Sequence, residues 1–189
     1  VLGSAATAYN NAEGTKKHHT VSEAAIKNVS SENLYLHPSF EEAGNTYMFP
    51  LVTGMSYTTS DAYLGERSLK VELSGNSSCG SVSINEAGTY CFSAYVKSVN
   101  VTGTAGFYLW SSSAGIIENS RIYFPLGTTN TEIENGWQRI YFTVEITSPG
   151  THFLYIDGTG TGTVYVDCFQ LEKGKAPGKY NLVEKATTS

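Results

Sequence analysis

The clearest alternation of hydrophobic and polar positions lies towards the C-terminal end, in residues 163–172. Apolar side chains from Val164 to Leu171 alternate with polar or amphipathic ones, which predicts a strand with one buried face. The alternation shifts by one residue at Asp167 and Cys168, as a β-bulge would cause. We therefore expect a bulge here that re-aims the Asp167 side chain.

Shorter alternating runs precede this segment, separated by turn residues such as Gly, Asn and Pro, and none of useful length has a helical period. The predicted strands are residues 68–73, 80–85, 89–97, 105–111, 121–126, 138–146, 151–157 and 163–171. This many antiparallel strands in one domain most often close as two packed sheets, because an open sheet leaves exposed edges. The sequence therefore predicts an all-β protein, a β-sandwich jelly roll of two antiparallel sheets.

Apolar positions on one side of these strands predict the core, whose burial supplies the main driving force for folding. They are Leu36, Phe40, Leu69, Val71, Phe92, Val96, Leu109, Trp137, Phe142, Val166 and Leu171.

The domain organisation follows from changes in composition. Residues 1–32 lack sustained alternation, so we expect a linker or the end of a preceding unit, followed by one domain over residues 33–174. Asn33-Leu34 recurs as Asn181-Leu182, beyond a Gly- and Pro-containing stretch. Residues 175–189 are therefore expected to be a linker and the start of a following module in a tandem array.

Composition and charge exclude several function classes. The net charge of −5 and pI near 5.3 disfavour nucleic acid, which binds clustered Lys and Arg, and no apolar run is long enough for membrane insertion. Cys79, Cys91 and Cys168 have no zinc-ligand spacing. No carboxylate pair, GxSxG motif or nucleophile with a base is evident, so we expect no enzyme activity.

Five sequence blocks, in this order and spacing, resemble a known family. They are NLYLHPSFE, GERSLKVEL, TYCFSAYVKS, NGWQRIYFTVEI and GTGTVYVDCFQLEKG. Together they look like the calcium-containing β-jelly-roll carbohydrate-binding modules of the group spanning families 4, 9, 16 and 22, over residues 33–174. The ending QLEKGKAPGKYNLVE is similar to tandem modules in Gram-positive cell-surface proteins with RHS/YD-type repeats. The resemblance implies a non-catalytic module, a monomer within a longer secreted or cell-surface chain.

The resemblance also implies a structural Ca²⁺ bound by the carboxylates of Glu41 and Asp167, with backbone carbonyls near residues 68–70. Ca²⁺ prefers such oxygen ligands. Cys168 stands where relatives often carry a second Asp, which leaves fewer acidic ligands. The alternative is that both carboxylates face solvent or a Lys.

Aromatic side chains on the polar sides of strands are the candidate ligand-binding residues. Tyr95 shares a side with Lys97, Tyr108 shares one with Trp110, and Tyr123 is expected beside them. We expect these aromatic side chains to lie on one shared sheet face. Aromatic rings stack on the apolar faces of sugars, while nearby polar groups bind the hydroxyls. The sequence therefore predicts a carbohydrate partner, although strand aromatics also serve in packing. The alternative function is a non-binding spacer or adhesion module.

Overall fold

The computed structural model describes residues 34, 40–41, 51, 53–73, 78–103, 105–124, 133–158 and 160–180. All regular structure in these residues is strand, which confirms the all-β prediction. They include no helix that could cross a membrane. Residues 1–32 and 181–189, assigned above to linkers and neighbouring units, lie outside the described residues, as does Leu36 of the predicted core.

Six strands form one antiparallel sheet, in the order β1-β2-β11-β4-β9-β8. Their bounds are β1 Met55–Thr58, β2 Ser68–Leu73, β4 Gly88–Thr102, β8 Ile133–Glu134, β9 Trp137–Ile146 and β11 Thr161–Lys173. The last strand, β11, lies inside the sheet between β2 and β4. The N–H of Leu34 donates to the carbonyl of Leu171 at 2.9 Å, so Leu34 lies against β11 although the two are far apart in the sequence.

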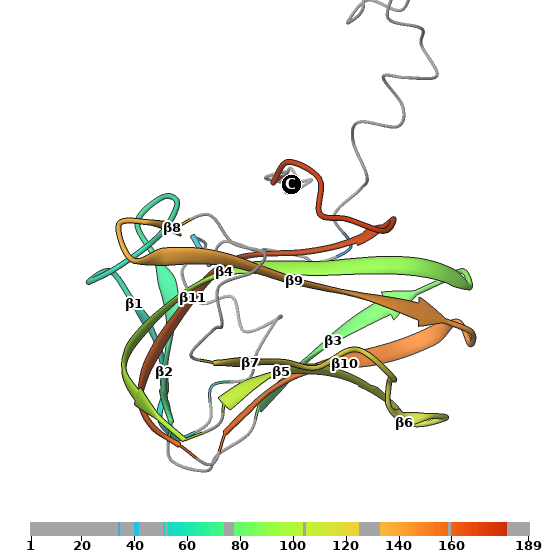
Figure 1. Ribbon diagram of the computed structural model, residues 1–189, viewed down its shortest axis with the longest axis horizontal. Helices are drawn as coiled ribbons and strands as arrows, with labels where there is room; N and C mark the ends of the chain where they lie inside the picture. Colours follow the sequence, from blue (N-terminus) through green and yellow to red (C-terminus); the bar gives the residue numbers. More distant parts are fainter. Residues whose placement is uncertain are drawn as a thin grey trace, which may run out of the picture.

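The other sheet has five strands, in the order β3-β10-β5-β6, with β7 also paired to β5. Their bounds are β3 Ser78–Ile84, β5 Ala105–Ser111, β6 Gly115–Ile116, β7 Ile122–Phe124 and β10 Gly150–Gly158. The sheets are stacked as two layers, with β4, β9 and β11 in one and β3, β5 and β10 in the other (Figure 1). The predicted two-sheet jelly roll is confirmed.

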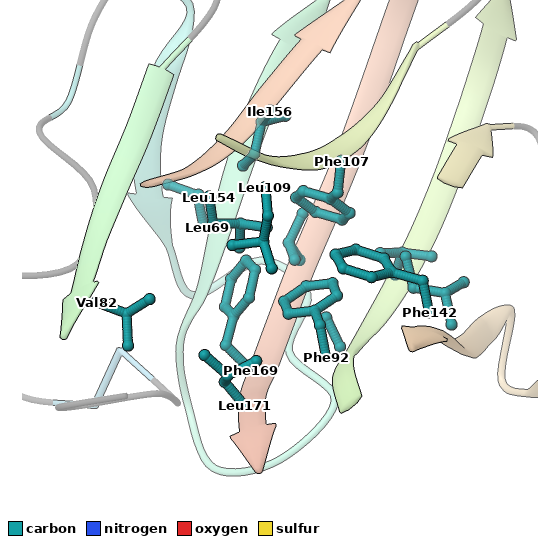
Figure 2. Close-up of a cluster of buried hydrophobic side chains, with 14 of the residues drawn as sticks. Leu69, Val82, Phe92, Phe107, Leu109, Phe142, Leu154, Ile156, Phe169 and Leu171 are labelled. Carbon is teal, nitrogen blue, oxygen red and sulfur yellow. The ribbon is translucent and has the colours of Figure 1, made fainter. Parts of the chain in front are cut away.

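A cluster of aromatic and aliphatic side chains fills the space between the sheets. Phe92, Phe107, Phe142 and Phe169 approach one another there, and Phe92 is 5.6 Å from Phe107 across the two sheets (Figure 2). All predicted core residues that the structure describes are buried. The cluster holds the sheets together, because each large side chain contributes about 1.5–3 kcal/mol on burial.

The predicted strands agree with the observed ones where the alternation is long. β2 and β5 have the predicted bounds, and β4 continues five residues further than expected, to Thr102. β1, β6 and β8 were not predicted, since they are four residues long or shorter and form through pairing with a neighbouring strand.

The predicted bulge in β11 is present. The pairing of β11 with β4 shifts register between Asp167 and Gln170, and Cys168 has a φ of 51°. This left-handed conformation is uncommon for residues other than Gly and turns the strand locally. The bulge directs Asp167 towards the loop before β2.

The expectation of a single buried face on β11 is wrong. Asp167, Gln170 and Glu172 are also buried, at 0–2% exposure. Asp167 accepts hydrogen bonds from the backbone of Tyr63, and Glu172 accepts one at 2.6 Å from the N–H of Gly178. The loop before β2 and the segment after β11 therefore cover the outer side of the six-stranded sheet.

Candidate functional site

The predicted ligand-binding residues are divided between the two sheets. Tyr95 and Lys97 lie on β4 of the six-stranded sheet, whereas Tyr108 and Trp110 lie on β5, and Tyr123 on β7, of the five-stranded sheet. The expectation of one shared face is therefore wrong. Alternation shows which residues of a strand point to the same side, but not which sheet the strand joins.

The outer side of the five-stranded sheet carries aromatic side chains in two cross-strand rows. Trp110 pairs with Phe153 of β10 and with Ile116 of β6, and Tyr108 pairs with Tyr155. The rings of Tyr108 and Tyr155 stack at 5.0 Å with 3° between their planes, and those of Trp110 and Phe153 are 5.8 Å apart. These four rings are half-buried. With Tyr123, which is 48% exposed, they form what we call the aromatic face.

Arg121 places a positive charge at one end of the aromatic face. Its guanidinium lies 4.5 Å from the centre of the Tyr108 ring and 5.7 Å from that of Tyr123, within the range of cation–π attraction. Tyr108 is therefore held between Tyr155 and Arg121. The nearest oxygen of Asp157 is 3.8 Å from the guanidinium, too far for a hydrogen bond. Burial raises the pKa of Asp157, and Arg121 offsets part of that effect.

Gly106 sets the position of β7 beside this face. It pairs with Tyr123, and a side chain at Gly106 would collide with the backbone of Ile122. Only glycine allows β7 to approach β5 so closely. The close approach brings Tyr123 and Arg121 to the aromatic face.

Sequence reasoning missed Phe153, Tyr155, Asp157 and Arg121. The signal for the first three was present, because they alternate with the apolar residues Leu154 and Ile156 in the predicted strand 151–157. Burial of Leu154 and Ile156 agrees with this alternation. Arg121 had the same signal, because it lies two residues before Tyr123 in the predicted strand 121–126, although the observed β7 begins at Ile122.

Tyr95 is covered by another ring. Tyr63, from the loop before β2, stacks on it at 3.6 Å with 12° between the planes, and the Arg139 guanidinium lies 5.5 Å from its centre. Lys97 forms a 2.7 Å ion pair with Asp61 of the same loop. These two predicted ligand-binding residues thus hold the loop against the six-stranded sheet.

Trp137 is buried, as predicted, but not between the sheets. Its indole Nε1 donates to Asp61 at 3.2 Å, and its ring meets Tyr63 edge-on at 6.1 Å. A cavity of about 270 Å³ lies beside it, lined in part by Lys97 and Asn135. Trp137 therefore anchors the loop on the outer side of the sheet.

Asp167 has a fully buried carboxylate. It accepts hydrogen bonds from the backbone N–H groups of Tyr63 at 2.9 Å, Leu64 at 3.0 Å and Cys168 at 2.7 Å. Loss of water around the carboxylate raises its pKa to about 7, although these three donors oppose the rise. No Lys or Arg contributes to this pKa in the part of the chain described.

Glu41 binds the next part of the same loop. Its carboxylate accepts hydrogen bonds from the N–H groups of Glu66 and Arg67 at 3.0–3.1 Å. A side chain at Gly65 would collide with this carboxylate. The two predicted metal ligands thus meet one loop, at residues 63–67.

The donor set for a cation is small. Among the described residues, no group of three or more His, Cys, Asp or Glu side chains is arranged to hold a metal. Glu41 and Asp167 could contribute carboxylate oxygens, and no Lys or Arg of the described ranges balances the buried charge of Asp167. These residues fit Ca²⁺ if backbone carbonyls or water supply the remaining oxygens, as Ca²⁺ sites allow.

Comparison with solved structures finds similar folds at low sequence identity. The xylan-binding CBM22-1 domain of Paenibacillus barcinonensis Xyn10C is 20% identical, with a TM-score of 0.53, covering 78% of this chain and 98% of that domain. A putative sugar-binding protein from Bacteroides thetaiotaomicron is 11% identical, with a TM-score of 0.53, covering 76% of this chain and all of that one. A CBM4 structure is 13% identical, with a TM-score of 0.50, covering 74% of this chain and 99% of that one.

The chain has the jelly-roll fold of carbohydrate-binding modules. No protein-family model matches the sequence, and no curated protein matches it either. Two places in this fold are candidate functional sites, because one carries outward-facing aromatic rings and the other a buried carboxylate. These are the aromatic face of the five-stranded sheet and the loop anchored by Glu41 and Asp167.

Proposed function

We propose that the chain is a non-catalytic carbohydrate-binding module that binds a glycan on the aromatic face. The observation that carries this proposal is the group of five rings, on β5, β7 and β10, on the outer side of the five-stranded sheet. Solved modules with this fold, one of them xylan-binding, give it further support.

The aromatic face offers two kinds of contact to a sugar. The rings of Trp110 and Phe153 provide apolar surface on two adjacent strands. Neighbouring strands of a sheet lie about 4.8 Å apart, so successive sugar units of a glycan could pack across the two rings. Arg121 and Asp157 keep hydrogen-bonding capacity, because 3.8 Å separates their nearest atoms. Affinity should be modest, since a sugar exchanges water hydrogen bonds for protein ones at a net gain of about 0.5–1.5 kcal/mol each.

Substitution of Trp110 tests this proposal. A glycan array would identify a ligand, and Trp110→Ala should weaken its binding at least about tenfold in titration calorimetry, which corresponds to about 1.4 kcal/mol. Tyr165→Ala is the matched control, because Tyr165 is a half-buried tyrosine on the six-stranded sheet. Equal affinities for the two variants, with both folded, would overturn the assignment to the aromatic face.

The alternative is a spacer or adhesion module that binds no sugar. The contacts of Tyr108 favour it, since Tyr155 and Arg121 occupy both sides of that ring and leave less of it for a ligand. Absence of binding by the wild-type chain to any glycan on the array would support the spacer function.

We also propose a structural Ca²⁺ held by Glu41 and Asp167. When bound, the ion would supply the positive charge that the buried Asp167 carboxylate lacks. Both residues already hold the loop at residues 63–67, so the ion would tie that loop to β11.

The biological context is proposed from the sequence resemblance. The module would be a monomer in a longer multidomain chain that is secreted or displayed on a bacterial surface. Fractionation of the producing cells, with an antibody against this module, would test the location, and recovery in the cytoplasm would contradict it.

A further inference from the structure

A cleft lies at one end of the sandwich, next to the Trp110 end of the aromatic face. It is lined by residues from 111–119, around β6, by residues 143–148 at the end of β9, and by His152 of β10. Its volume is about 380 Å³, within the range of small-molecule sites. None of the five rings of the aromatic face lines it.

Hydrogen bonds fix the β6 side of this cleft. The buried hydroxyl of Ser120 donates a hydrogen bond to the Ile117 carbonyl at 2.6 Å and accepts one from the N–H of Leu109 at 3.1 Å. The hydroxyl of Ser111, also buried, accepts the N–H of Ala114 at 3.2 Å. The cleft wall is therefore preorganised, which reduces the entropy lost when a ligand binds.

The charge of the lining disfavours an anion. Among the described residues, the charged ones that line the cleft are Glu118 and Glu145, and Thr89 donates to Glu145 at 2.8 Å. The other polar groups include the hydroxyls of Ser113 and Thr147. Hydroxyl and carboxylate groups together suit a ligand rich in hydrogen-bond donors.

His152 adds a hydrogen-bond acceptor to the lining of the cleft. Its Nδ1 lies 3.1 Å from the carbonyl oxygen of Gly150. A carbonyl oxygen can only accept a hydrogen bond, so Nδ1 carries the hydrogen. Nε2 of the neutral ring is then an acceptor, and the described residues supply it with no partner. The residue is 2% exposed and lines the cleft.

We propose that this cleft is a second carbohydrate site, which takes a neutral or amine-bearing sugar unit and rejects uronic acids. The sugar hydroxyls would donate to His152 and to the carboxylates, and the apolar side of the ring would rest against Ile116, which is 51% exposed. An amine would gain charge-assisted hydrogen bonds to Glu118 or Glu145, whereas a uronate carboxylate would be repelled.

Nitrogen-15 NMR titration of the full chain can separate the two sites, because each site has its own residues. The probes are the methyl β-glycosides of glucose, glucosamine and glucuronic acid. We expect saturable shifts in residues 111–119 and 143–148 with the glucoside, several-fold tighter binding of the glucosaminide, and no saturation with the glucuronide. These shifts should persist in Trp110→Ala, so failure of the aromatic face would leave the cleft unaffected.

Thr147→Trp provides the decisive variant, since Thr147 is an exposed turn residue whose enlargement would fill the cleft without entering the core. It should abolish the shifts. Ala87→Trp is the control, an exposed position in the turn before β4, at the same end of the sandwich and outside the lining. Unchanged shifts in Thr147→Trp, saturable glucuronide binding, or no saturable shift at the cleft with either other probe would overturn the proposal.

Discussion

At the scale of single residues, burial decides the chemistry of Asp167. Its carboxylate is excluded from water, and its described partners are three backbone N–H groups and the Cys168 thiol. Neutral donors offset only part of the lost solvation, so the pKa rises to about 7. The shift in alternation predicted that Asp167 is re-aimed. It could not predict burial, because the covering loop lies some hundred residues earlier in the sequence.

The raised pKa of Asp167 predicts how stability depends on pH when a chelator is present. The Asp167 carboxyl has a pKa near 3.8 in the unfolded chain and about 7 in the folded protein. Its favourable contribution to the free energy of unfolding is therefore fully present below pH 3.8. Stability should fall as pH rises from about 4 through 7, by a few kcal/mol in all, since one pKa unit is about 1.4 kcal/mol. Urea unfolding at a series of pH values measures this. Asp167→Asn is the control and should flatten this part of the profile, and an identical profile in both proteins would contradict the assignment.

At the scale of strands, the length of the alternation determined what the sequence could predict. β2, β5 and β9 were evident because six or more residues alternate in each. β6 and β8 have two residues each and exist only as partners of β5 and β9. Gly160 and Gly162 lie in tight contact with β4 and the residue that follows it. The sequence could not predict this contact, because contact between distant segments leaves no local pattern.

Gly162 should be sensitive to substitution for this reason. Its φ is +116°, and a side chain there would lie 2.7 Å from Cα of Val101 on β4. Gly162→Ala should therefore cost about 1–3 kcal/mol for overpacking, in addition to the cost of its backbone conformation. Gly150→Ala is the matched control, with a φ of +145° and nothing within 4 Å of the added group. Urea unfolding compares the two, and an equal loss of stability would show that contact with β4 is unimportant.

At the scale of the whole molecule, the two outer surfaces differ in how they are covered. The six-stranded sheet is overlaid by the loop that Asp61, Glu41 and Asp167 anchor, and by the segment bonded to Glu172. The five-stranded sheet presents the rings of the aromatic face. Sequence alternation correctly sent Tyr95 and Trp110 outward on their strands, but only tertiary structure shows that Tyr63 stacks on the first of them.

The proposed Ca²⁺ would act on the whole molecule, because Glu41 belongs to the start of the module and Asp167 to its last strand. Ca²⁺ should raise the melting temperature, and more at pH 8 than at pH 5, since binding requires the deprotonated form of a carboxyl whose pKa is about 7. Differential scanning calorimetry with Ca²⁺ or chelator measures the effect, and Mg²⁺ controls for general screening. Asp167→Asn should remove most of the Ca²⁺-dependent rise, because it removes a charged ligand while keeping the shape of the side chain. If wild-type melting curves with Ca²⁺ and with chelator coincide at pH 8, the two carboxylates hold the loop through its N–H groups alone.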